Sequence, residues 1–304
     1  MIPLAAAIVA SVAVGVRAER RFGDAARSAT ERLLRFVLWI VLPVVAFINL
    51  NALDLDVKVG AGIAYAWLAL GCCVGIAYGA GRFLLRLPRP STGALMLSAS
   101  IGNTGYLGLP LAAALLGLDA LPDAIAYDLL VSALGTVTIG FSVAAAFGTV
   151  GARPRDRAIA FVVRNPPLWA TAAAFVAPHA LAPDWVVDAS RGLVIAMVPV
   201  GFFALGVILA TVAEEGVAAF PPPLTAATAV GTTIKLLVAP AIVLTLSALV
   251  LDVPDAYVSQ AAMASGINGL AVAQEFGLDR GLVAALIAWT TAITLVWGLV
   301  VALL

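Results

Sequence analysis

Long apolar stretches separated by short polar connections dominate the chain. A helix that crosses the hydrocarbon core of a bilayer needs about 20 mostly apolar residues. The sequence contains ten stretches of this kind, the first of them the shortest, near residues 2–16, 32–51, 58–83, 92–118, 121–148, 158–180, 185–212, 223–250, 256–276 and 280–303. This pattern predicts an all-α polytopic membrane protein with ten transmembrane helices embedded in a lipid bilayer.

The composition supports a membrane protein and excludes several other classes. Hydrophobic residues make up 63% of the 304 residues and charged residues 11%, whereas soluble domains average about 45–50% and about 25%. A net charge of zero offers no basic face for a nucleic acid. Cys72 and Cys73 are adjacent within an apolar stretch, which favours packing over a metal site. We expect no metal, no cofactor and no enzymatic activity, because the stretches hold too few ionisable residues for a catalytic cluster.

The basic residues predict how the helices are oriented. The odd-numbered connections carry 14 of the 17 Lys and Arg residues and the even-numbered ones carry two. Lys and Arg are enriched in cytoplasmic loops of membrane proteins. We therefore expect the odd connections in the cytoplasm and both termini outside, in a bacterial plasma (inner) membrane. The clean sorting also indicates an even number of helices.

The fifth connection divides the chain into two halves, residues 1–152 and 153–304, with five stretches each. An odd number of spans per half places the halves in opposite orientations, which is the arrangement of inverted-repeat transporters. An internal echo supports the repeat: the motif Ala-Ser-x-x-Asn at residues 99–103 recurs 165 residues later at residues 264–268. The sequence therefore predicts a 5+5 inverted repeat.

The fourth and ninth stretches contain residues that break helices. The fourth combines three glycines and a proline with Asn and Thr, and the ninth has a weaker counterpart around Asn268. Interrupted helices at matching places in two halves indicate a transport site, and their free N–H groups suit an anion. The predicted substrate-binding residues are Gly102, Asn103, Thr104, Gly105, Pro110, Asn268 and Gly269. The alternative is that the small residues only permit close helix packing.

Three ionisable residues within the stretches are candidates for coupling or for neutralising the substrate. A charge deep in a membrane span is costly and indicates function by default. Lys235 could face the substrate, or its long side chain could reach the interface or pair structurally. Asp128 could relay protons or lie near the outer interface. Glu275 could couple ions or mark the cytoplasmic end of its span.

Several segments resemble a known family. The run Gly102–Pro110 resembles the fourth-helix signature of the auxin efflux carrier family. Further similar segments are Arg164–Pro167, Pro199–Gly206, Lys235–Pro240 and Asn268–Gly277. The resemblance implies a fold related to the bile acid/sodium symporters, with helices 4 and 9 broken and crossing. It also implies a scaffold domain and a transport domain, each built from both repeats, and elevator-like motion. Unlike many relatives, this chain has no proline in the ninth-helix break.

Together these observations predict a secondary transporter for a small organic anion such as a mono- or dicarboxylate. Family members move organic anions, which the resemblance extends to this chain. The sequence leaves open whether protons or sodium ions drive transport and whether the chain forms a homodimer. The alternative function is a channel or a non-transporting sensor on the same fold.

The predicted topology is testable with tags at the chain ends. We expect an epitope tag before Met1 or after Leu304 to react with a membrane-impermeant reagent on intact cells, since the charge sorting places both ends outside. A tag in the fifth connection, near Arg155, should react only after permeabilisation. Protection of both terminal tags in intact cells would contradict the topology.

Overall fold

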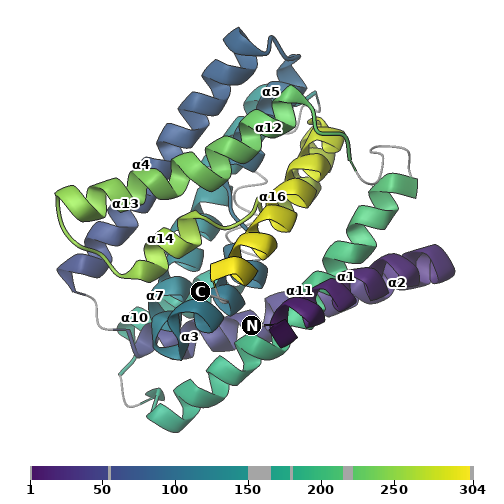
Figure 1. Ribbon diagram of the computed structural model, residues 1–304. Coiled ribbons are helices and arrows are strands. Elements are labelled where there is room, and N and C mark those ends of the chain that lie inside the picture. Colours follow the sequence, from purple (N-terminus) through teal and green to yellow (C-terminus); the bar gives the residue numbers. More distant parts are fainter. Residues whose placement is uncertain (1, 54–55, 150–165, 179–180, 215–221, 302–304) are drawn as a thin grey trace.

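The computed structural model describes residues 2–53, 56–149, 166–178, 181–214 and 222–301 (Figure 1). Within these ranges the regular elements are helices, and the β-type pairing is limited to one isolated bridge. The predicted boundary at residues 152 and 153 and both chain ends lie outside the described residues. The all-helical prediction is confirmed for the part of the chain that the structure describes.

The first five predicted stretches each contain helix, in several cases as consecutive segments. Segments labelled η are π-helical, except the single 3₁₀ turn η4. They are α1 (Ile2–Phe22), α2 (Asp24–Phe36), η1 (Val37–Val41), α3 (Leu42–Asn51), α4 (Val57–Gly79), η2 (Ala80–Leu84), α5 (Arg89–Ser100), η3 (Thr104–Gly108), α6 (Leu109–Leu116), η4 (Leu118–Ala120), α7 (Leu121–Tyr127), η5 (Asp128–Ala133), η6 (Thr136–Gly140) and α8 (Phe141–Phe147).

The second half contains the remaining elements. They are α10 (Pro166–Val176), α11 (Asp184–Glu214), α12 (Ala226–Thr233), η8 (Ile234–Val238), α13 (Ala239–Leu249), α14 (Asp255–Ala261), α15 (Asn268–Phe276) and α16 (Arg280–Val301). Among the described residues, six helical spans are long and apolar enough to cross a membrane: Asp24–Asn51, Val57–Leu84, Leu118–Phe147, Asp184–Thr211, Ala226–Leu249 and Arg280–Val301. These spans support an integral membrane protein.

Three prolines follow π-helical segments within the spans. Pro43, Pro110 and Pro240 each lie two residues after the last residue of η1, η3 and η8. A proline ring inside an α-helix clashes with the carbonyl group four residues earlier. In all three cases that carbonyl belongs to the π-helical segment, whose wider turn makes room for the ring. Local π-helical bulges therefore accommodate these prolines within the helices.

One group of helices consists of α1, α2, α3, α10 and α11. Helices α1 and α11 lie side by side (Figure 1). A Cβ atom at Gly15 would lie 2.2 Å from the carbonyl oxygen of Phe203, and one at Gly206 would lie 2.2 Å from that of Val12. The two backbones approach this closely because both contact positions are glycine. We call these five helices the first helix group.

Buried amides join the other members of this group. The Asn49 side chain donates a hydrogen bond to the Ser190 hydroxyl of α11 (2.8 Å). The Asn51 side chain donates to the carbonyl groups of Ala174 and Ala177 (3.1 and 3.0 Å), at the end of α10. These bonds satisfy side-chain N–H groups that a bilayer cannot hydrate.

The other helices, α4 to α8 and α12 to α16, form a second helix group. Helix α4 contacts α5 and α13, and α16 contacts α5 and α12 (Figure 1). Its polar links include Trp67, whose indole N–H donates to the Leu130 carbonyl (3.0 Å), and the paired Ser91 and Asp279. The two groups meet where Tyr106 of η3 packs against α11: a Cβ at Gly201 would lie 2.6 Å from the Tyr106 ring.

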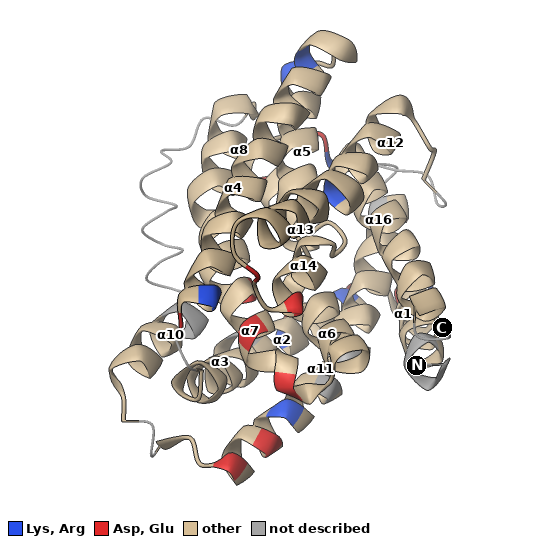
Figure 2. Ribbon diagram, turned by 60° about the vertical axis from the view of Figure 1, so that its left-hand side comes forward, with Lys and Arg blue, Asp and Glu red and all other residues tan. Residues whose placement is uncertain are grey.

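Contacts between the connections follow the same division into odd-numbered and even-numbered connections that the Lys and Arg residues show. The third and ninth connections meet where the Ser91 hydroxyl donates to Asp279 (2.7 Å). The second and eighth meet where Lys58 pairs with Asp252 (3.3 Å). Most residues of the helices are uncharged (Figure 2). In these contacts an odd-numbered connection meets an odd-numbered one, and an even-numbered connection meets an even-numbered one. This is expected if successive connections lie on alternate sides of the membrane.

The close contact between α1 and α11 gives a stability prediction. We expect Gly206→Val to lower the stability of the purified protein by roughly 1–3 kcal/mol, since its side chain has no space against the α1 backbone. The measurement is thermal unfolding in detergent. Gly192→Ala, in the same helix with nothing within 4 Å of its Cβ position, should be neutral or slightly stabilising. Equal effects of the two substitutions would contradict this packing.

Candidate functional site

Two helices are interrupted at the places that the sequence indicates. Helix α5 ends at Ser100, and helical structure resumes at Thr104. Helix α14 ends at Ala261, and α15 begins at Asn268. The second interruption is present although it contains no proline. We call residues 101–103 and 262–267 the two breaks.

The two breaks pair with each other through their backbones. Gly102 and Ser265 form an antiparallel bridge. The Asn103 N–H donates to the Ala264 carbonyl (2.7 Å), and the Gly266 N–H donates to the Ile101 carbonyl (3.0 Å). Each break therefore supplies hydrogen-bond partners that the other lacks in its own helix.

The pairing depends on small residues and on flanking hydroxyl groups. A Cβ at Gly266 would lie 3.0 Å from the Gly102 carbonyl oxygen, so a side chain there would press on the opposite strand. The Ser265 hydroxyl donates to the Ser98 carbonyl (2.7 Å), and the Ser265 N–H donates to the Thr290 hydroxyl (2.9 Å). These bonds fix the second break against α5 and α16.

Asp128 lies beside the first break. The Thr104 hydroxyl donates a hydrogen bond to the Asp128 carboxylate. A Cβ at Gly105 would lie 3.3 Å from a carboxylate oxygen of the same residue. The structure thus brings Asp128, Thr104 and Gly105 together, so the carboxylate belongs to the region of the breaks.

Lys235 also reaches the first break. Its side chain is 2% exposed, and its ammonium group donates a hydrogen bond to the Ala261 carbonyl (3.2 Å) at the end of α14. A Cβ at Gly102 would lie 3.2 Å from the Lys235 Nζ atom. No carboxylate oxygen of a described residue lies within 4.0 Å of this nitrogen. The ammonium therefore lies buried between the two breaks without a described counter-charge.

Asn103 occupies the first break itself and is 5% exposed. Its N–H and carbonyl groups are both bonded, the carbonyl to the Gly108 N–H (3.0 Å). Its side-chain amide has no hydrogen-bond partner among the described residues. Pro110 lies buried at the start of α6, where it shapes the helix behind the break.

The predicted residues of the ninth stretch lie in different environments: one is buried and two are exposed. Gly269 is buried, and its N–H donates to the Gly266 carbonyl (3.0 Å). Asn268 begins α15 with an exposed side chain. Glu275 is exposed near the far end of α15, about 10 Å along the helix from Asn268. Glu275 is therefore not among the groups that meet at the breaks.

Gln260 is a polar residue near the site that the sequence reasoning missed. It is fully buried, and its side-chain nitrogen lies 3.4 Å from the Ala124 carbonyl oxygen. Its side-chain oxygen is buried without a hydrogen-bond partner among the described residues and adjoins Gly108. An uncharged amide in an apolar span is the signal that could have identified it.

Comparisons with known proteins relate this chain to membrane transporters. Residues 159–301 match the family described as "Membrane transport protein". A stretch of 163 residues is 28% identical to an uncharacterized transporter of Methanocaldococcus jannaschii, covering 52% of this chain and 51% of that protein. The match thus spans about half the length of this relative. The match over residues 159–301 confirms the predicted resemblance to the auxin efflux carrier family of membrane transport proteins.

Proposed function

We propose that the protein is a secondary transporter that carries a small organic anion, such as a mono- or dicarboxylate, and binds it at the paired breaks. The observation that carries the proposal is the buried ammonium of Lys235 beside Gly102. A buried charge is costly unless it is paired, and an anionic substrate would supply the missing counter-charge.

Neutral donors near Lys235 support an anion at this place. The Asn103 amide has two N–H donors and no described partner. The first turn of η3, beginning at Thr104, has N–H groups that precede its helical hydrogen bonds. Together they would provide oriented dipoles for a carboxylate, while the Lys235 ammonium has donors beyond its one bond to Ala261.

The backbone pairing supports an inverted repeat of residues 1–152 and 153–304. The sequence echo relates the halves by an offset of 165 residues, which maps Ile101 onto Gly266. These two residues are directly hydrogen-bonded in an antiparallel arrangement. Equivalent residues meeting in antiparallel pairing are expected at a local two-fold axis between repeats.

The two helix groups support an elevator-type alternation of access. Both breaks belong to the second helix group, which would act as the transport domain, and the first group would act as the scaffold. Tyr106 faces Gly201 across their boundary, so a small residue lies where the moving group would slide. The fold would then be the ten-helix arrangement of the bile acid/sodium symporters.

Asp128 is the candidate for energy coupling. It is the carboxylate that adjoins the breaks among the described residues, and it accepts a hydrogen bond from Thr104. Coupling to protons would use this group, whereas sodium would require further oxygen ligands around it.

We further propose a bacterial plasma membrane location with both termini outside.

Replacing Lys235 tests the proposal directly. We expect Lys235→Met to reduce counterflow of labelled carboxylate in proteoliposomes about tenfold or more, because a hydrogen bond to a charged group contributes about 1.5–3 kcal/mol. Its thermal stability should stay equal or rise, because the variant removes an unpaired buried charge. Lys58→Met is the matched control, since Lys58 is exposed and pairs with Asp252, and it should transport normally. Undiminished counterflow in Lys235→Met would refute the assignment, and non-saturating flux without exchange in the unmodified protein would indicate a channel.

Asn103→Ala gives a second test of the same site. We expect this variant to lose uptake while its unfolding temperature changes little, because the amide makes no described bond within the protein. Asn51→Ala is the comparison: it removes two structural hydrogen bonds and should cost about 1–3 kcal/mol of stability. Normal uptake by Asn103→Ala would show that the amide does not contact substrate.

A further inference from the structure

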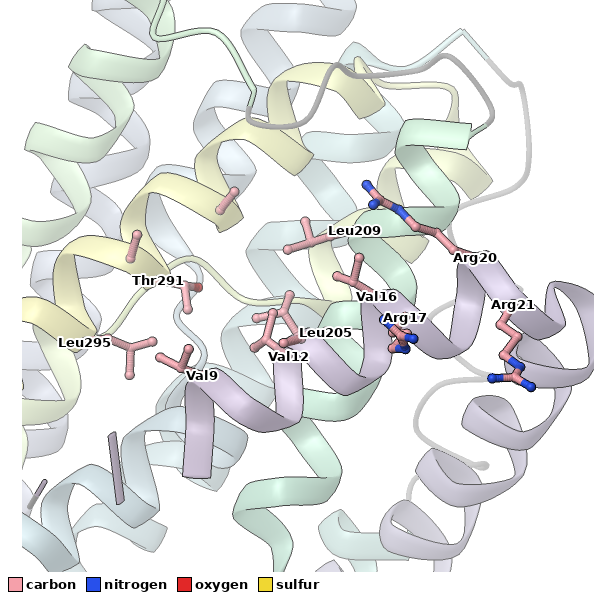
Figure 3. Close-up of a pocket in the computed structure, with 13 residues that line it drawn as sticks. Val9, Val12, Val16, Arg17, Arg20, Arg21, Leu205, Leu209, Thr291 and Leu295 are labelled. Carbon is pink, nitrogen blue, oxygen red and sulfur yellow. The ribbon is translucent and has the colours of Figure 1, made fainter. Parts of the chain in front are cut away.

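A cavity of about 920 Å³ lies between α1, α11 and α16 (Figure 3). None of its lining residues is among the predicted substrate contacts. Apolar side chains from all three helices form its walls, including Val9, Val12, Leu205, Leu209 and Leu295. Thr291 adds one hydroxyl group. A ligand that fills this cavity therefore needs a long apolar portion.

Three arginines of α1 lie at one end of the same cavity. Arg17, Arg20 and Arg21 line it and are exposed (Figure 3). No carboxylate oxygen of a described residue lies within 4.0 Å of their guanidinium groups. Arg27, by contrast, pairs with several carboxylates, including Glu214. The three guanidinium groups are thus available for an anion next to an apolar cavity.

The length of the cavity wall matches one leaflet of a bilayer. Val9 and Arg21 are twelve residues apart on α1, which corresponds to about 18 Å along the helix. Half of a hydrocarbon core is about 15 Å thick. A lipid whose phosphate lies at the arginines would therefore extend its acyl chain along the wall to the region of Val9.

We propose that this cavity binds an anionic phospholipid, with its phosphate at Arg17, Arg20 and Arg21 and an acyl chain between α1, α11 and α16. Basic pockets between membrane helices commonly hold such headgroups. The site lies at the boundary of the two helix groups, because α1 and α11 belong to the first and α16 to the second. A bound lipid would contact both groups.

The test uses the purified full-length protein after delipidation in detergent. We would titrate phosphatidylglycerol or phosphatidylcholine with identical acyl chains and follow the unfolding temperature. We expect phosphatidylglycerol to raise it more than phosphatidylcholine does, and glycerol phosphate, which has no acyl chain, to leave it unchanged. An equal shift with both phospholipids would overturn the proposal.

Two pairs of variants separate the headgroup from the chain. Arg17→Gln with Arg21→Gln should weaken phosphatidylglycerol binding about tenfold or more, whereas Arg82→Gln with Arg86→Gln, which removes the same charge elsewhere, should not. Ala292→Phe, which fills the cavity, should also weaken binding, whereas Ile293→Phe on the exposed neighbouring position should not. Equal effects within either pair would overturn the site. Displacement of the lipid by a short-chain carboxylate would show instead that the cavity belongs to the substrate pathway.

Discussion

The hydrogen bonds between the two breaks are the constraint on which the rest of the structure depends. A membrane helix that stops in mid-span leaves peptide groups without partners, and hydrocarbon offers none. Here Asn103 bonds to Ala264 and Gly266 bonds to Ile101, so two interruptions that would each be costly become compatible with burial. The flanking bonds of Ser265 to Ser98 and Thr290 tie this pairing to α5 and α16. The second helix group is built around it.

The same pairing explains why charged and polar groups collect at this place. The absence of side chains at two glycines leaves room for Lys235 to reach Gly102 in the first break and for Asp128 to reach Gly105 in the first turn of η3. Both contacts are tight, because a Cβ atom would lie 3.2 Å from the Lys235 ammonium at Gly102 and 3.3 Å from the Asp128 carboxylate at Gly105. The proposed substrate site is thus formed by residues that are distant in sequence and are brought together by the breaks.

The sequence predicts much of this arrangement because its signals are local. Apolar length marks the spans, and glycine with proline marks the fourth-stretch break. The weaker Gly266 and Gly269 pattern also predicted a real interruption. The geometry of this second break could not be predicted from the sequence, since it depends on pairing with residues 165 positions away. For the same reason, Asp128 and Lys235 could be flagged as unusual but not placed at the breaks, while Glu275, equally unusual in sequence, lies elsewhere. Gln260 was overlooked because an uncharged amide disturbs the hydropathy pattern little.

The boundary between the helix groups has a consequence for how such a carrier would work. Because the two breaks satisfy one another, a moving second group would take its whole binding region along without opening any of those backbone bonds. The energy barrier to this motion would then arise at contacts between the two groups. One such contact is the Tyr106 ring against the backbone of Gly201. The rate of transport would then depend on the contacts between the two helix groups. The selectivity would depend on the site at the paired breaks, whose geometry would stay the same while the second group moves.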